Sequence, residues 1–166
     1  MTFRQRSIAA TLHVTTGMPE FNVTVFSLML NFPWEVLQAR LFTGMSDAPY
    51  VEAVNGCVQA TLGDVVITLL AYWSVAVVAG SRRWILAPTD RKLALFIAIG
   101  VSITGVIEWL ATSGRWVRSW SYSSNMPVVP GIDIGLAPLV QWVIVPLLVA
   151  WFVQRQLSNR GADRHG

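Results

Sequence analysis

Residues 58–80 read VQATLGDVVITLLAYWSVAVVAG, and Asp64 is the one charged residue in this stretch. A helix rises 1.5 Å per residue, so about 20 apolar residues cross the roughly 30 Å hydrocarbon layer of a bilayer. The stretch is too long for a strand of a membrane β-barrel, which needs only about ten residues of alternating polarity. Residues 58–80 therefore predict a transmembrane helix.

Three further apolar runs of similar length cover residues 21–43, 92–113 and 133–153, and the first of them is the least apolar. The whole chain has 166 residues, of which 54% are hydrophobic and 13% are charged. Soluble domains carry about a quarter charged residues, so this chain has too little charge to coat a soluble surface. We predict an all-α membrane protein, a four-transmembrane-helix bundle that forms a single domain over residues 1–166.

The basic residues predict the orientation of this bundle. Nine of the twelve fall before the first helix, between the second and third, or after the fourth, namely Arg4, Arg6, Arg82, Arg83, Arg91, Lys92, Arg155, Arg160 and Arg164. The positive-inside rule makes that side cytoplasmic, so both termini are expected inside, in a bacterial inner membrane. The segment before the first helix has no long apolar core, so we expect it to lie on the membrane surface and not to be a cleaved signal. Residues 114–132, rich in Trp, Tyr and Pro, are expected to form a folded-back external loop.

Composition also limits the partners. The net charge of +3 does not indicate nucleic acid, because the basic residues lie in short loops and form no patch interleaved with aromatics. The single cysteine, Cys57, cannot form an internal disulfide. Both histidines lie near the termini, so no intramembrane metal site built on histidine is predicted. The expected partners are the lipid bilayer and a hydrophobic small molecule, with a homo-oligomer or larger membrane complex left open, and the sequence does not identify a cofactor.

Polar residues recur along one face of each predicted helix. They are Ser27, Asn31, Glu35 and Gln38 in the first, Thr61, Asp64, Thr68 and Tyr72 in the second, Thr104, Glu108 and Thr112 in the third, and Pro138 and Gln141 in the fourth. Spacings of three and four residues place side chains on one stripe of a helix. Counted from the helix ends, Glu35, Asp64, Glu108 and Gln141 all fall roughly 8–12 Å below the external surface. This shared depth predicts one buried polar pocket in the outer leaflet.

The three acids of this pocket are the candidate catalytic residues. A charged side chain at the bilayer centre costs about 2.5–3.5 kcal/mol even on the lenient insertion scale, so these acids should face the bundle interior. No lysine or arginine lies at their depth, which favours a neutral acid able to donate a proton. We therefore expect Glu35 and Glu108 to act as proton donor and acceptor, with Asp64 tuning them. The candidate substrate-binding residues are Asn31, Gln38, Tyr72, Tyr122 and Gln141.

A purely structural interpretation competes with this one. Buried Asn, Gln, Ser and Thr often only hydrogen-bond neighbouring membrane helices. Asp64 follows Gly63 and could simply cap a frayed helix start. The sequence leaves both interpretations open.

Two segments resemble known proteins. NFPWEVLQ, residues 31–38, and IEWLATSGRWVRSWSYSSNMPVVPGIDIGLAPLVQ, residues 107–141, are similar to a group of uncharacterised small bacterial inner-membrane proteins, which implies no activity. The second segment places an acid late in a helix before a Gly-Arg-Trp turn, a Tyr and a Pro-rich re-entry, an order similar to that in membrane carotenoid cyclases and hydratases. That similarity implies acid chemistry on a polyene. The chain is shorter than most of these enzymes and does not match their motifs residue by residue, so no site is carried over from them.

Three functions fit the sequence, which leaves open whether the chain is an enzyme. The first is a membrane enzyme that acts on a lipid or isoprenoid by acid–base chemistry. The alternative is a non-catalytic protein that binds a lipid, quinone, pigment or ion, or that scaffolds a complex. A proton-coupled transporter subunit fits less well, because the polar residues cluster in one leaflet and offer no continuous path.

Overall fold

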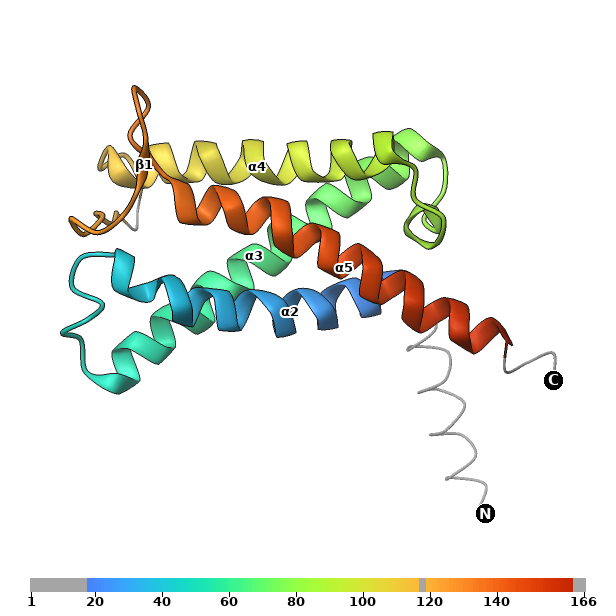
Figure 1. Ribbon diagram of the computed structural model, residues 1–166, viewed down its shortest axis with the longest axis horizontal. Helices are drawn as coiled ribbons and strands as arrows, with labels where there is room; N and C mark the ends of the chain where they lie inside the picture. The colour runs from blue at the N-terminus through green and yellow to red at the C-terminus, as the bar shows by residue number, and fades with distance from the viewer. Residues whose placement is uncertain (1–17, 117–118, 163–166) are drawn as a thin grey trace, which may run out of the picture.

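A computed structural model describes residues 18–116 and 119–162 (Figure 1). Within these ranges the chain forms four α-helices, two short 3-10 helices and a small antiparallel hairpin. They are α2 (Pro19–Gln38), η1 (Ala39–Leu41), α3 (Tyr50–Ala79), η2 (Trp84–Leu86), α4 (Asp90–Thr112), β1 (Val128–Val129), β2 (Ile134–Gly135) and α5 (Leu136–Ala162). The expected surface segment before the first helix lies outside the described residues.

The four predicted helices are confirmed, although two of them are longer than expected. α3 begins at Tyr50 and not at residue 58, directly after Pro49, and α5 continues to Ala162 and not to residue 153. Polar residues such as Glu52 and Gln154 occupy these extensions, so hydropathy alone does not detect them. Helices can continue past the hydrocarbon layer because water and headgroups solvate polar side chains there.

Three of the described helices are long and apolar enough to cross a membrane. Their best windows have mean hydropathies of 1.9 in α3, 2.1 in α4 and 2.1 in residues 136–158 of α5. The chain is therefore a membrane protein. The remaining helix, α2, is less apolar, because its sequence carries the stripe of polar residues described above.

The helices form a bundle in which α2 and α4 lie along opposite edges (Figure 1). Each of these two helices packs against both α3 and α5. At one end of the bundle α2 and α4 finish while α3 and α5 begin, and we call this the acidic end because Glu35, Asp64 and Glu108 lie toward it. We call the other end, which carries Arg82, Arg83, Arg91 and Lys92 between α3 and α4, the basic end.

Polarity is inverted relative to a soluble protein. Polar side chains are buried, namely Asn22, Ser27, Asn31, Glu35, Gln38, Thr61, Thr68, Thr104, Glu108 and Gln141. Large apolar side chains face outward, and the most exposed include Leu37, Val77, Val78, Val51 and Met29. A soluble monomer rarely exposes contiguous apolar surface on this scale, whereas lipid tails solvate it well.

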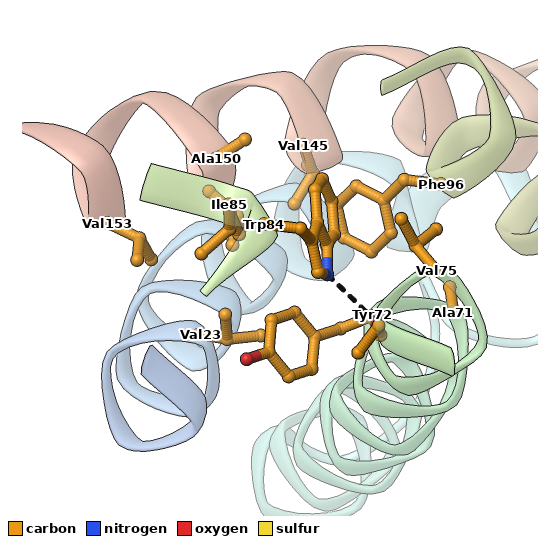
Figure 2. Close-up of a cluster of buried hydrophobic side chains, with 12 residues drawn as sticks. Val23, Ala71, Tyr72, Val75, Trp84, Ile85, Phe96, Val145, Ala150 and Val153 are labelled. Carbon is orange, nitrogen blue, oxygen red and sulfur yellow. Dashed lines mark hydrogen bonds between the residues drawn. The ribbon is translucent and has the colours of Figure 1, made fainter. Parts of the chain in front are cut away.

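Toward the basic end the interior is apolar and aromatic. Tyr72 of α3, Trp84 of η2 and Phe96 of α4 pack together between valines of α2, α3 and α5 (Figure 2). The Trp84 Nε1–H donates to the Tyr72 carbonyl at 3.2 Å. The Tyr72 hydroxyl donates to the Arg82 carbonyl, and the Arg82 guanidinium pairs with Glu20 of α2 at 2.7 Å. These bonds fasten the loop after α3 against the start of α2.

Replacing Tyr72 by Phe is expected to lower the free energy of unfolding by about 1 kcal/mol, because the partly buried hydrogen bond to the Arg82 carbonyl is lost. Steric trapping in lipid bicelles measures this quantity. Tyr50→Phe is the matched control, since the Tyr50 side chain is exposed. Equal effects of the two substitutions would contradict a structural role for the Tyr72 hydroxyl.

Candidate functional site

A cavity of about 470 Å³ opens at the acidic end, between α3 and α4 and beneath the segments that follow α2 and α4. Its polar wall contains Glu35, Gln38, Asp64, Thr104, Glu108 and Gln141. The rest of its lining is largely apolar and includes Phe42, Met45, Ile67, Ile107, Trp116, Trp120 and Trp142. An apolar chamber with a few convergent polar groups is the usual form of a small-molecule site.

Gln141 of α5 is the centre of a hydrogen-bond network that joins three helices. Its Nε2 donates to Asn31 Oδ1 at 2.9 Å, to Glu35 Oε1 at 3.1 Å and to Asp64 Oδ2 at 2.9 Å. A side-chain amide has only two N–H groups, so three acceptors share two protons. Gln38 Nε2 reinforces the network by donating to Glu35 Oε1 at 2.7 Å and to Gln141 Oε1 at 3.2 Å.

A second layer of hydroxyls and amides holds this network in place. Asn31 Nδ2 donates to Ser27 Oγ at 2.9 Å, and Ser27 Oγ donates to Thr68 Oγ1 at 3.0 Å. On the other side, Trp34 Nε1 donates to Gln38 Oε1 at 3.1 Å. The polar stripes of α2 and α3 thus face each other, and their side chains hydrogen-bond to one another across the helix contact.

The Glu35 and Asp64 carboxyl groups, from adjacent helices, both accept from Gln141 Nε2, so the two carboxyls lie close together. We treat this pair as the first acidic group of the cavity.

Glu108 of α4 forms a second acidic group, which is held by the loop between α4 and α5. Its Oε2 accepts from Trp120 Nε1 at 3.2 Å and from the Tyr122 hydroxyl. The Tyr122 oxygen in turn accepts from the backbone N–H of Gly135 at 3.0 Å. Tyr122 therefore ties the loop between α4 and α5 to the carboxyl group in the cavity.

The same loop is fastened to the end of α2. The Thr43 N–H donates to the Ser121 carbonyl and the Ser123 N–H donates to the Leu41 carbonyl, both at 2.9 Å. These two bonds flank the bridge between Phe42 and Tyr122. The loop thus closes the bundle at its acidic end, where Trp116 and Trp120 line the cavity.

Burial and the hydrogen bond to Glu108 raise the pKa of the Tyr122 phenol above its ordinary value of 10.0. The folded chain then keeps this proton at a pH where the unfolded chain loses it. Stability from Tyr122 is therefore complete below about pH 10 and declines as the pH rises further. We expect the free energy of unfolding of the wild type to fall above pH 10 more steeply than that of Tyr122→Phe, measured by steric trapping across this range. Parallel pH profiles would contradict the contact.

The structure brings most of the predicted site residues together. Asn31, Glu35, Gln38, Asp64 and Gln141 share one network, and Glu108 with Tyr122 forms the second acidic group of the same cavity. Tyr72 does not join them. It lies two turns further along α3, about 12 Å from Asp64 along the helix axis, and bonds to Glu20 and Arg82 at the basic end.

Trp120, which the sequence interpretation did not assign to the site, contacts Glu108. Trp142 was also missed. Thr104 was placed on the polar stripe but given no role, and with Trp142 it lines the cavity. The sequence feature that could have pointed to Trp142 is its position next to Gln141. Among the described residues no group of three or more His, Cys, Asp and Glu side chains is placed to hold a metal ion.

Comparison with known proteins adds no family to this description. The chain matches no protein-family model, no curated protein sequence and no solved structure.

Proposed function

We propose that this chain is an integral membrane enzyme that binds a lipid or isoprenoid in the cavity at its acidic end and transfers protons to and from it. The observation that carries the proposal is the presence of two separate acidic groups in one apolar chamber. Glu35 with Asp64 comes from α2 and α3, and Glu108 comes from α4. General acid–base catalysis needs one group that gives a proton and one that takes it.

In the proposed reaction one carboxylic acid protonates the substrate, and a carboxylate of the other group removes a proton from it. The total number of protons on the enzyme is then unchanged after each turnover. The tryptophans of the lining could stabilise a positive charge that develops on the substrate, since indole faces attract cations. Asn31, Gln38 and Gln141 keep the Glu35 and Asp64 carboxyl groups directed at the chamber.

We also propose that α2 is a fourth membrane span and that both termini lie in the cytoplasm of a bacterial cell. α2 has 20 residues and packs along α3 and α5, two helices that are themselves apolar enough to cross. Its polar residues face the interior, so its outer face is compatible with lipid. The basic end of the bundle would then face the cytoplasm and the cavity would open toward the outer leaflet.

Non-catalytic binding is the alternative, and one observation favours it. The Gln141 network is satisfied by protein groups alone, as in a purely structural polar core. A proton path through the bundle has less support, because the interior toward the basic end is the aromatic and aliphatic cluster of Figure 2.

Filling the cavity tests whether it binds a molecule at all. Gly63 lines the chamber and a Cβ there meets no atom within 4 Å, so Gly63→Leu should fold and fill part of the space. We expect mass spectrometry of the chain purified from native membranes to find about tenfold less co-purifying lipid-soluble molecule in this variant. Gly105→Leu is the control, since Gly105 is equally open but outside the lining. An identical bound fraction in all three proteins would refute the site.

A further inference from the structure

Two buried polar groups of the cavity have no hydrogen-bond partner within the part of the chain that the structure describes. They are Trp142 Nε1 on α5 and Thr104 Oγ1 on α4. Both side chains line the chamber, and they are only 2% and 7% exposed. A buried polar group without a partner is costly, so such groups in a folded protein call for an explanation.

The lack of a hydrogen bond from the Thr104 hydroxyl distinguishes it from the other helical threonines of the described chain. The other four threonines of the described helices, Thr24, Thr61, Thr68 and Thr112, all donate to the backbone carbonyl four residues earlier. Thr104 has the same helical setting and does not make this bond. Its hydroxyl proton is therefore available to another acceptor.

The position of Trp142 is fixed by close packing against α4. A Cβ on Gly100 would lie 2.1 Å from Trp142 Cε3 and 2.5 Å from Cζ3, so the six-membered ring presses against a position that only glycine can occupy. The indole nitrogen lies on the opposite edge of the ring system from these two carbons. Gly100 and Thr104 are one turn apart on the same face of α4. Trp142 thus packs against the face of α4 that carries Thr104, and both side chains belong to the lining of one chamber.

The charges of the lining restrict what these donors can bind. Three acidic residues line the chamber, while no Lys, Arg or His is among its described lining residues. A phosphate or carboxylate headgroup would meet like charge without compensation. An uncharged ligand oxygen, such as that of a ketone, accepts hydrogen bonds without this repulsion.

We propose that Trp142 and Thr104 form a subsite for an uncharged oxygen acceptor, so that the ligand of the cavity is a neutral, oxygen-bearing apolar molecule. This inference rests on the proposed function, because it names the substrate class of the same cavity. The Trp142 N–H and the Thr104 O–H bind the oxygen, while the apolar lining holds the hydrocarbon part. The oxygen is thereby placed in the chamber that contains the acids.

Three probes test the subsite on the full-length chain in lipid nanodiscs. Farnesylacetone carries a ketone, farnesene has no oxygen, and farnesoic acid carries a carboxylate. Thr104→Val keeps the shape of the side chain, and Trp142→Phe removes the N–H. We expect each substitution to weaken farnesylacetone binding by about two- to tenfold and to leave farnesene binding unchanged, as loss of one hydrogen bond requires. Trp109→Phe on the outer face of α4 is the control, and farnesoic acid should bind more weakly than the ketone.

Infrared spectroscopy distinguishes the loss of a hydrogen bond to the ligand from a loss of binding caused by misfolding. The C=O stretch of bound farnesylacetone should lie at lower frequency in the wild type than in Thr104→Val. Equal binding of ketone and hydrocarbon, unchanged by both substitutions, would overturn the oxygen subsite and leave the proposed cavity intact. If the wild type binds none of the probes, and Gly63→Leu does not alter the co-purifying molecule, the subsite and the proposed function both fail.

Discussion

Replacing Glu108 by Gln is expected to lower turnover of the bound substrate by about 10²–10⁴, the usual contribution of a general acid or base. The amide keeps nearly the same shape and its oxygen can still accept from Trp120 and Tyr122, so the loop should stay in place. What the amide lacks is a proton that it can give up and take back. The measurement is a comparison of lipid and pigment products in membranes of cells that make the wild type or the variant.

Glu52→Gln is the control for this experiment. Glu52 lies in the first turn of α3, is exposed, and is outside the cavity. Its replacement should leave the product profile unchanged. If Glu108→Gln also leaves every product unchanged while the protein still binds its ligand, the enzyme interpretation falls and non-catalytic binding takes its place.

Replacing Gly100 by Ala is expected to destabilise the protein by about 1–3 kcal/mol, the common cost of overpacking a core. The added methyl group would overlap the Trp142 ring, which is rigid and 2% exposed. The ring must then move away from α4, and the wall of the cavity changes with it. Steric trapping in bicelles gives the free energy of unfolding. Farnesylacetone binding, measured as above, shows whether the cavity lining has changed.

Gly105→Ala separates the clash from the general effect of a glycine in a helix. Gly105 is on the same helix and a Cβ there meets no atom within 4 Å. Alanine favours the helix by up to about 1 kcal/mol over glycine, so this variant should be neutral or slightly more stable. The same response at both positions would show that Trp142 does not pack against Gly100.

Much of the fold and the centre of the site could be predicted from the sequence. Length and hydropathy are local properties, and they located all four helices. The spacing of Ser27, Asn31, Glu35 and Gln38 predicted one polar stripe on α2, and all four side chains are buried. Counting residues from the helix ends predicted that Glu35, Asp64 and Gln141 lie at the same depth, and in the structure they share a hydrogen-bond network. Each of these predictions used only the helical repeat and the cost of polar groups in hydrocarbon.

The remainder depended on contacts between distant segments. Tyr72 lies on the same polar face of α3 as Asp64, but two turns closer to the basic end, where it bonds to Arg82. A common face therefore did not imply a common site. Trp120 reaches Glu108 through a loop whose path no periodicity describes. Thr104 and Trp142 stand out because their buried polar atoms have no hydrogen-bond partner among the described residues. The absence of a hydrogen bond leaves no pattern in the sequence. Orientation in the membrane stays a prediction from the basic residues.

The central claim is that side chains of α2 and α3 converge on Gln141 of α5, and solid-state NMR of the chain in lipid bilayers tests it most directly. The labels are ¹⁵N on the Gln141 side-chain amide and ¹³C on the carboxyl carbons of Glu35 and Asp64. Since its Nε2 lies 3.1 Å and 2.9 Å from their oxygens, rotational-echo dephasing should report both carbons within about 4 Å of one nitrogen. Dephasing from neither carbon, or from only one, would contradict the convergence on which the site and its chemistry depend.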